Sequence, residues 1–415
     1  MIPSPPAPSI CILTGNHLCH NPRALKEALA FSEAGYNVTV LGAWTDARLK
    51  ERDRALMASL PFEFRPVVDF TACPLARLAR GLKSRAGQAA HQLMGYESSW
   101  QIGASSGSLE RAARSTSADL YIAHSESAMV VADRLLGEGR RVGVDLEDWF
   151  SEDLLPEARS GRPIKLLRRL EGDLLRHGAY RTCTSRAMAE ALAREYDCET
   201  PAVIYNAFAW SDRSTIDGQS MDRVNHNVPS VHWYSQTLGF GRGLEDLLAA
   251  LPLLQHEAEI HLRGKPATGF KQWLATNLCK EWRERVFVHD LVPSDKLLSR
   301  IAEHDVGFAG EQKYCRSRDL TVTNKILHYL LGGLAVVASD TAGQREVAEL
   351  AKGAVLLYPA ADAKALAGQL DTLLSDSARL AGARAAALTA AQRTFCWERQ
   401  VPNLIAAAKA GLSSD

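Results

Sequence analysis

Two basic residues in the second half of the chain accompany signals for a helix N-terminus. Lys325 directly follows Asn324, a good helix cap, and an apolar run continues to Leu331. Arg242 lies in a glycine-rich loop, residues 238–243, that precedes another predicted helix. A helix N-terminus carries free backbone N–H groups and partial positive charge, so it suits a phosphate. The pattern therefore predicts that Arg242, Lys325 and the nearby backbone bind an anion.

A related arrangement opens the chain. Residues 10–14 form an apolar, β-branched run bounded by Gly15, which predicts a buried first strand. The following loop leads to a helix with Asn21 as its cap and Pro22 at its first position. The loop at Gly15 is therefore aimed at a helix N-terminus. It lacks the Gly-x-Gly-x-x-Gly fingerprint, which argues against a dinucleotide-binding enzyme.

Polar side chains follow two further predicted strands of the first half. The strand at 119–125 has His124 near its end, and the strand within 139–150 ends in an acidic group with Asp145 and Asp148. Ligands bind at the carboxyl ends of strands in open α/β sheets. A lone histidine at such a place is more often structural than catalytic, and both interpretations of His124 stay open.

Composition limits the class of protein. The 415 residues are too many for one ordinary core, so two domains are expected. The 48 basic and 48 acidic side chains cancel, so no global charge attracts nucleic acid or a membrane. The eight cysteines are scattered without metal-site spacing, which favours reduced thiols in a cytoplasm. We read the start, residues 1–9, as a flexible tail and not as a signal peptide.

A basic segment at 74–94 admits two interpretations. Leucines recur in it at helical spacing, with basic residues between them: Leu75, Leu78 and Leu82 with Arg77, Arg80, Lys83 and Arg85. One interpretation is an amphipathic helix in weak peripheral contact with the inner face of a membrane, or with an anionic acceptor. The other is a solvated helix packed on its own domain. Gly81 and Gly87 weaken the helix and favour the second interpretation.

The stretch 322–346 resembles the nucleotide-sugar cradle of family 4 glycosyltransferases, many of which read NK-x-x-E-Y-x-x-x-G-x-P-V-V-A-[ST]-D-x-x-G-x-x-E. The matching residues are Asn324, Lys325, Tyr329, Gly333, Val336, Val337, Ala338, Ser339, Asp340, Gly343 and Glu346. The opening NPRALKEA, the segment PAVIYNA and the terminal TFCWERQ also resemble this family. The resemblance thus extends over nearly the whole chain.

The resemblance implies an α/β protein of the GT-B fold, with two Rossmann-like domains facing across a cleft. The N-terminal acceptor domain would comprise residues 10–210, and the C-terminal nucleotide-sugar domain residues 231–395. The polar, turn-rich stretch 211–230 is expected to link them. A terminal helix, 396–415, would cross back to the N-terminal domain.

The resemblance also implies a hexosyl-type glycosyltransferase. It would move a sugar from a nucleotide-diphosphosugar to a hydroxyl of a glycan, a lipid-linked acceptor or a small molecule, with retention and without metal or cofactor. A UDP-sugar is slightly favoured, and a GDP-sugar stays open. The implied catalytic residues are His124, Arg242 and Lys325. The implied donor-binding residues are Gly15, Gln236, Gly241, Arg242, Leu291, Asn324, Lys325, His328 and Glu346. The implied acceptor-binding residues are His20, Arg23, Asp145 and Asp148.

Two positions depart from the family where it has glutamates, Leu320 and His328. Leucine cannot replace the carboxylate that touches the donor sugar, although Asp319 or Glu311 could substitute for it. Histidine keeps a hydrogen bond to the ribose but loses the two-oxygen acceptor. These departures support an alternative, a catalytically degenerate GT-B protein that partners an active subunit or binds a saccharide.

Overall fold

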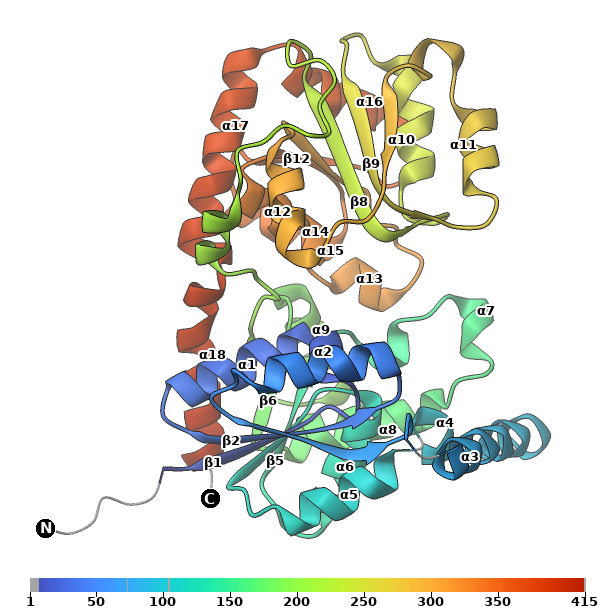
Figure 1. Cartoon of the computed structure of the whole chain (residues 1–415), viewed down its shortest axis with the longest axis vertical. Coiled ribbons are helices and arrows are strands. Elements are labelled where there is room, and N and C mark those ends of the chain that lie inside the picture. The colour runs from blue at the N-terminus through green and yellow to red at the C-terminus, as the bar shows by residue number, and fades with distance from the viewer. Residues whose placement is uncertain (1–6, 73, 104, 414–415) are drawn as a thin grey trace, which may run out of the picture. The chain divides into compact units, whose positions relative to one another are not determined.

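The computed structural model describes residues 7–72, 74–103 and 105–413. Contacts divide these residues into two compact units, described separately below (Figure 1). The first unit comprises the chain up to Thr184, Met188–Ile204 and the residues from Val401 onward, and the second comprises Ser185–Ala187 and Tyr205–Gln400. None of the helices in the described part of the chain combines the length and apolarity needed to cross a membrane.

The first unit is built on a seven-stranded parallel sheet in the order β3-β2-β1-β4-β5-β6-β7. Its strands are β1 (Ser9–Leu13), β2 (Asn37–Trp44), β3 (Glu63–Asp69), β4 (Leu120–Ala123), β5 (Val142–Leu146), β6 (Tyr180–Cys183) and β7 (Ala202–Val203). Its helices are α1 (Pro22–Glu33), α2 (Ala47–Met57), α3 (Pro74–Met94), α4 (Ser99–Ile102), α5 (Ser106–Ser115), α6 (Glu126–Gly137), α7 (Pro156–Arg159), α8 (Ile164–His177) and, from Met188 onward, α9 (Arg186–Tyr196). The strand order reverses direction between β1 and β4, so residues following these strands lie at a topological switch point.

Local sequence accounts for the first strand–helix unit. β1 is buried almost throughout, as its apolar run predicts. The side chain of Asn21 accepts a hydrogen bond from the backbone N–H of Ala24 at 3.1 Å, and Pro22 occupies the first helical position of α1. Both contributions are those that the sequence predicts for this helix start.

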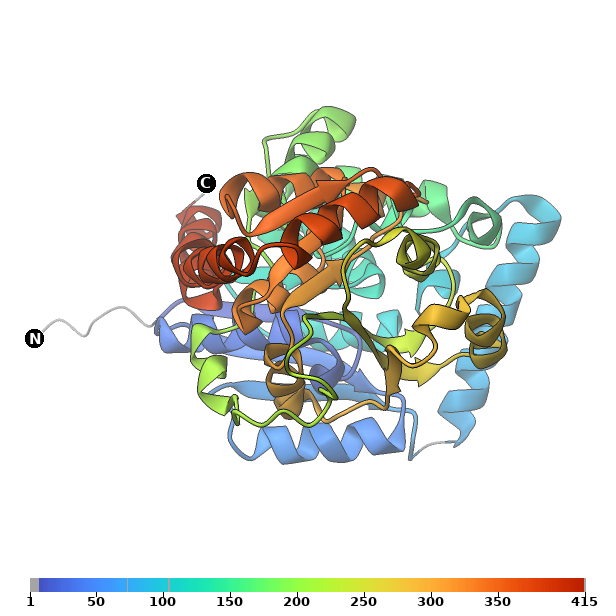
Figure 2. The same cartoon turned by 90° about the horizontal axis from the view of Figure 1, so that it is seen from above.

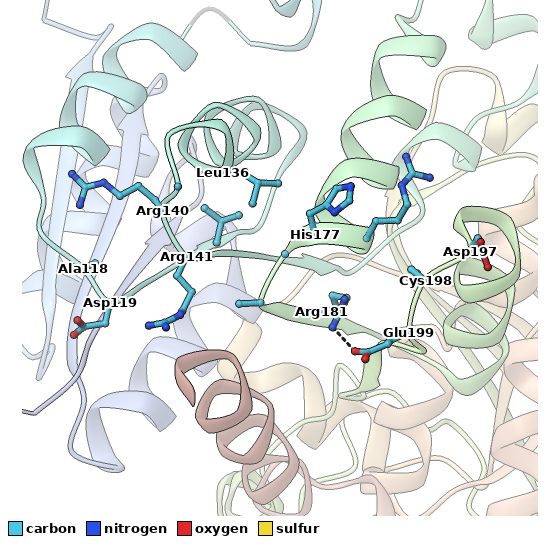
Figure 3. Close-up of a pocket in the computed structure, with 15 residues that line it drawn as sticks. Ala118, Asp119, Leu136, Arg140, Arg141, His177, Arg181, Asp197, Cys198 and Glu199 are labelled. Atoms are coloured by element: carbon cyan, nitrogen blue, oxygen red, sulfur yellow. Dashed lines mark hydrogen bonds and ion pairs between the residues drawn. The ribbon is translucent and has the colours of Figure 1, made fainter. Parts of the chain in front are cut away.

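A peripheral helix and a large cavity are two further features of the first unit. Helix α3 lies at the edge of the unit in both views (Figures 1 and 2). A cavity of about 1050 Å³ lies at the amino ends of β4, β5 and β6, lined among others by Asp119, Arg141 and Arg181 (Figure 3). Arg181 is already bound there, because its guanidinium contacts Glu199 and the carbonyl oxygen of Leu175 at 2.5 and 3.0 Å.

The second unit contains a six-stranded parallel sheet in the order β10-β9-β8-β11-β12-β13. Its strands are β8 (Ser230–Leu238), β9 (Glu259–Pro266), β10 (Val286–His289), β11 (Val306–Ala309), β12 (Ala335–Ser339) and β13 (Val355–Tyr358). Its helices are α10 (Leu244–Ala250), α11 (Phe270–Asn277), α12 (Ser294–Ala302), α13 (Arg316–Leu320), α14 (Asn324–Gly332), α15 (Ala342–Leu350), α16 (Ala363–Leu374) and α17 (Ser377–Ala390). The switch point lies between β8 and β11.

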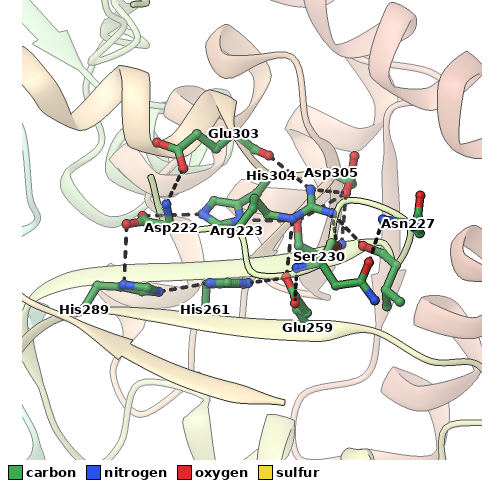
Figure 4. Close-up of polar contacts among 12 residues, drawn as sticks. Asp222, Arg223, Asn227, Ser230, Glu259, His261, His289, Glu303, His304 and Asp305 are labelled. Atoms are coloured by element: carbon green, nitrogen blue, oxygen red, sulfur yellow. Dashed lines mark hydrogen bonds and ion pairs between the residues drawn. The ribbon is translucent and has the colours of Figure 1, made fainter. Parts of the chain in front are cut away.

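The two faces of this second sheet differ in polarity. Alternate residues of β8 and β9, such as Trp233 and Leu262, belong to an apolar core. The intervening residues point to the other face and are polar, and His232 and His261 are paired across the two strands. Figure 4 shows the polar contacts on this face, which extend to Asp222.

The stretch 211–230, expected to be a linker, packs within the second unit. Its first part forms a 3₁₀ turn, Trp210–Thr215. Arg223 then forms an ion pair with Asp305 at 2.9 Å, and Asp217 pairs with Arg300 at 2.8 Å. The polar composition that suggested a solvated linker instead supplies side chains that bind charged groups of the sheet and of α12.

The terminal helix is α18 (Trp397–Ser413). Its residues up to Gln400 pack with the second unit, and those from Val401 onward pack with the first. Close to its end, a Cβ atom on Gly411 would lie 2.9 Å from the backbone oxygen of Ala179, so a small residue permits this approach.

Candidate functional site

A glycine-rich turn at the carboxyl end of β8 positions Arg242. Gly241 and Gly243 adopt φ values of +69° and +79°, a region that side-chain-bearing residues rarely occupy. A Cβ atom on Gly243 would also lie only 2.0 Å from the carbonyl oxygen of Gly310. Glycine is therefore required for the turn to pass close to the loop that follows β11.

Glu311, in the loop after β11, pairs with Lys325 and lies within electrostatic range of Arg242. The Lys325 ammonium lies 2.5 Å from a Glu311 oxygen, and Arg242 donates a hydrogen bond to the Ser235 hydroxyl at 2.9 Å. Burial opposes ionisation of Glu311, but Lys325, followed by Arg318 and Arg242, lowers the pKa of this carboxyl below its usual range. Two cations and one anion thus gather at the carboxyl edge of the second sheet.

The other residues predicted to bind a donor on this edge lie at exposed positions. Gln236 is exposed near the end of β8, Leu291 is exposed after β10, and Asn324 is exposed at the start of α14. The cap of α14 is Thr323, whereas the sequence suggested Asn324 as the cap. Asn324 is therefore the first residue inside the helix, and its side chain is not the N-cap.

His328 differs from the expectation that it faces a ribose. It is only 7% exposed, lies parallel to the Phe208 ring at 4.0 Å between centroids, and its Nδ1 is 2.9 Å from the Tyr234 hydroxyl. Every residue of α14 from Ile326 to Gly332 is buried, and His328 is one of them. The histidine is thus held in the interior of the second unit.

Glu346, also predicted to bind the donor, instead holds the N-terminus of α9. Its two carboxylate oxygens accept hydrogen bonds from the backbone N–H groups of Arg186 and Ala187 at 3.0 and 3.1 Å. The hydroxyl of Tyr205 donates a third at 2.5 Å. With both oxygens occupied and 5% of the residue exposed, Glu346 is a helix-capping residue.

The proposed substitutes for the missing glutamate at Leu320 are engaged elsewhere. An Asp319 oxygen accepts a hydrogen bond from the backbone N–H of Ala342 at 3.1 Å, at the start of α15. Glu311 pairs with Lys325, as described above. In this structure neither carboxylate takes the place of the family's first glutamate.

The first unit gathers three of its predicted site residues in a buried charged cluster. Asp145 accepts hydrogen bonds from the Arg23 guanidinium at 2.5 and 2.7 Å and from the Thr182 hydroxyl at 2.6 Å. The ring nitrogens of His124 lie 3.1 Å from Glu27 and 3.2 Å from Asp145. Glu27 is the member that the sequence did not suggest. Its spacing of four residues from Arg23 on an otherwise apolar helix face was the available signal.

The charges in this cluster stabilise one another. Burial alone would lower the pKa of His124, but Glu27 and Asp145 outweigh it and raise that pKa to about 10. Burial likewise opposes ionisation of Asp145, yet Arg23 and then His124 hold its pKa well below the usual range. The raised pKa of His124 favours the imidazolium at neutral pH, with one ring nitrogen near each carboxylate.

The expected acceptor-binding roles of Arg23 and Asp145 stay predictions. In this structure neither exposes any surface, and Asp145 lies between Arg23 and His124. His124 itself is 8% exposed. Of the remaining acceptor-side predictions, His20 is exposed after β1 and Asp148 is partly buried after β5.

Gly15 lines a cavity of about 280 Å³ at the carboxyl edge of the first sheet. Its φ is +64°, and a Cβ atom there would meet the Ser127 hydroxyl at 2.4 Å. Ser125, Glu126 and Arg80 also line this cavity. The loop that the sequence singled out thus forms part of a small polar hollow, on the edge opposite to the larger cavity of Figure 3.

Two groups in the described residues have the spacing of metal ligands. In the first, His17 Nε2 accepts the backbone N–H groups of Thr45 and Asp46, and its Nδ1 lies 2.8 Å from Asp53. In the second, Glu27, His124 and Asp145 surround one another beside the Arg23 guanidinium. In the first group the ligand atoms are already used in hydrogen bonds, and in the second the Arg23 cation occupies the neighbourhood of the carboxylates. Neither group is therefore suited to a metal ion.

Part of the sequence matches a known protein family. Residues 237–376 match the family model described as "Glycosyl transferases group 1", a segment that holds both Arg242 and Lys325. Among curated proteins, no sequence matches the chain.

Solved structures share the fold over the whole length. Anabaena HepE in complex with UDP is 18% identical, with a TM-score of 0.68 over 97% of this chain and 99% of that one. Sucrose-phosphate synthase from Thermosynechococcus elongatus is 14% identical, with a TM-score of 0.67 over 97% and 98% of the two chains. A glycosyltransferase from Rickettsia africae is 12% identical, with a TM-score of 0.64 over 99% and 100%.

The expected GT-B fold is thus confirmed by structures of full-length coverage, and the expected family by the segment that holds the two cations. Residues 237–376 thus match the group 1 glycosyltransferases, and the chain as a whole has the GT-B fold.

Proposed function

We propose that the protein transfers a hexosyl group from a UDP-sugar to an acceptor hydroxyl, with retention and without a metal ion. The choice of UDP is supported by similar structures: HepE was crystallised with UDP and with UDP-glucose. An Escherichia coli structure titled trehalose-6-phosphate is bound with UDP-2-fluoro glucose, and it is 12% identical to this chain with a TM-score of 0.64.

The observation that carries the proposal is the convergence of Arg242 and Lys325 at the carboxyl edge of the second sheet. Negative charge builds on the leaving diphosphate as the bond to the sugar breaks, and fixed cations stabilise that charge. Arg242 supplies a planar donor set and Lys325 a compact charge. Glu311 holds Lys325 in place before a donor arrives.

The first unit supplies no general base through His124. The buried carboxylates of Glu27 and Asp145 raise the pKa of this histidine to about 10, which makes it a poor proton acceptor at neutral pH. In the proposed transfer the acceptor O–H bond breaks, the new bond to the sugar forms as the sugar–phosphate bond breaks, and a leaving-phosphate oxygen takes the proton. Such a route keeps attack and departure on one face of the sugar.

Titration calorimetry with UDP tests the donor site. Arg242→Ala and Lys325→Ala should each weaken binding by about 2 kcal/mol, the scale of a lost charge-assisted hydrogen bond. Arg379→Ala removes an exposed arginine elsewhere in the second unit and should leave affinity unchanged. Unchanged affinity in both site variants would refute the assignment of Arg242 and Lys325 to the donor site. If GDP bound more strongly than UDP, the donor would be a GDP-sugar instead of a UDP-sugar.

Turnover should also survive excess chelator, because resident cations balance the phosphate charge. A rate that collapses with chelator and returns with Mn²⁺ would contradict the metal-independent part of the proposal.

Two substitutions favour the alternative of a catalytically degenerate partner protein. Leucine stands at 320, and His328 is turned into the interior against Phe208. The same calorimetry separates the hypotheses, since a degenerate protein should bind neither UDP nor UDP-glucose in its wild-type form.

A further inference from the structure

Helix α3 presents apolar side chains to solvent over most of its length. Four of its leucines are 57–84% exposed: Leu75, Leu78, Leu82 and Leu93. Met94, Tyr96 and Trp100 directly after them are 49–74% exposed. These seven account for most of the exposed large hydrophobic residues in the described part of the first unit, where Met57 and Leu155 are the others. Contiguous apolar surface of this kind marks an interaction site.

The exposed leucines form one stripe. At about 100° per residue, positions 75, 78, 82, 86, 89 and 93 fall within an arc of roughly 80° on the helix. Alanines occupy positions 86 and 89, so the stripe is apolar from end to end. Helix α3 is thus amphipathic although its leucines do not belong to a core.

The opposite side of α3 faces the rest of the first unit. Arg80 lies over the Phe70 ring at 5.2 Å, a Cβ atom on Gly87 would meet Trp100 at 3.1 Å, and His91 lies 2.9 Å from Gln101. These positions share a face roughly 180° from the leucine stripe. The stripe therefore points away from its own unit.

The charge of α3 identifies what covers the stripe. Residues 74–94 contain four Arg or Lys side chains and no Asp or Glu, although the chain as a whole has no net charge. Lys83 and Arg85 flank the stripe on either side, where their long side chains can reach past the leucines. An anionic lipid bilayer has an apolar interior and a negatively charged surface. It therefore complements both the apolar stripe and the positive charge of α3.

We propose that α3 binds the surface of an anionic membrane. The stripe from Leu75 to Leu93 enters the headgroup–acyl boundary, and Lys83 and Arg85 contact lipid phosphates. This inference is independent of the proposed donor, because it uses no residue of the second unit.

Vesicle co-sedimentation of the full chain tests the proposal. The protein should pellet with vesicles of phosphatidylcholine containing about 30% phosphatidylglycerol, far less with phosphatidylcholine alone, and less at high ionic strength. Leu78→Glu with Leu82→Glu should weaken binding by at least about tenfold. Lys83→Glu with Arg85→Glu should weaken it by at least about thirtyfold, because each cation near such a surface contributes about 1 kcal/mol.

Leu253→Glu is the matched control, since Leu253 is a 44% exposed leucine of the second unit, and it should bind vesicles like the wild type. Circular dichroism and thermal unfolding should be unchanged in the α3 variants, because their leucines are exposed in the folded chain. Vesicle binding that survives both double substitutions, or no binding by the wild type, would overturn the proposal. A dimer that becomes monomeric in Leu78→Glu with Leu82→Glu, without lipid binding, would assign the stripe to a second copy of the chain.

Discussion

Buried histidines occur in both units of this protein. In the first unit, His124 lies between Glu27 and Asp145. In the second, four histidines line the polar face of the sheet: His232, His261, His289 and His304. His124 has its pKa raised to about 10, whereas all four others have their pKa values lowered.

The difference follows from the neighbours of each ring. Burial, followed by the adjacent His304 and His289, lowers the pKa of His261 to about 2. Its nitrogens lie 3.0 Å from His289 and 3.2 Å from Glu259. Asp222 is near this group (Figure 4), but its carboxylate also binds the Arg263 guanidinium. Arg263 neutralises part of the negative charge of Asp222, and the remainder is too small to keep several buried histidines protonated.

The two regions show that a buried histidine keeps its charge only where enough carboxylates surround it. The first cluster contains two carboxylates for Arg23 and His124, so both cations persist. The second stacks imidazoles against one another, for example His232 on His304 at 4.5 Å, which is favourable while they are neutral. Removing one partner should therefore harm the charged cluster most.

The largest expected effect comes from Asp145→Asn. It leaves the Arg23 and His124 cations buried with one remaining carboxylate, and should lower the free energy of unfolding by about 3–5 kcal/mol. Urea denaturation measures the change. Asp133→Asn is the control, because its pair with Arg169 is at the surface and contributes about 0–1 kcal/mol. Equal losses in the two variants would contradict the comparison.

Asp222→Asn should cost less, about 1.5–3 kcal/mol, since Arg263 keeps its hydrogen bond to the backbone oxygen of Asp290 at 2.5 Å. Hydrogen exchange at the amides of β8 and β9 should report the loss, while β4 and β5 keep their protection. A loss that exceeded that of Asp145→Asn would show that the second cluster depends more heavily on its charges.

The units should respond oppositely to pH. The raised pKa of His124 gives stability that is complete below about pH 6.5 and is lost as pH rises towards 10, by at most about 1.4 kcal/mol per pH unit. The lowered pKa values of the second cluster give stability that is present above about pH 6.5 and is lost as pH falls, because the unfolded chain then binds more protons. Hydrogen exchange corrected for intrinsic rates separates the units. His124→Gln should remove the alkaline loss, and an unaltered alkaline slope in that variant would reject the assignment.

The smallest effect is expected for His232→Phe. Neither ring nitrogen of His232 has a hydrogen-bond partner among the described residues, and the ring is fully buried. Replacing it by an apolar ring should change the stability at pH 7 by less than about 1 kcal/mol and reduce the acid-induced loss. Thermal unfolding at pH 7 and pH 5 measures both quantities. A loss as large as that of Asp222→Asn would indicate that His232 donates or accepts a bond through water.

The sequence predicted the elements better than the side chains. The apolar runs and the cap at Asn21 located β1 and α1, because strand burial and helix capping are local properties. The position of His328 on α14 was also predicted, but its direction was not. Beyond its first turn α14 is buried on every side, so its sequence has no periodicity that marks one face. The direction of the His328 side chain therefore depends on packing against Phe208.

Interactions between distant residues account for the remaining differences. Glu346 matches a family motif, yet its carboxylate serves α9, about 160 residues earlier in the chain. Asp217, Asp222 and Arg223 looked like a solvated linker because their partners, such as Arg300 and Arg263, are far away in sequence. Charge pairing across such separations has no local signature.

The division of the chain has a consequence for its synthesis. The first unit needs the residues from Val401 onward, which leave the ribosome after the whole of the second unit. Domains commonly fold as units from the N-terminus during translation. Here the unit that is made first is completed last, when α18 supplies its final helix. A nascent chain that ends before α18 should therefore expose apolar surface on the first unit and depend on chaperones, whereas the second unit is already almost complete.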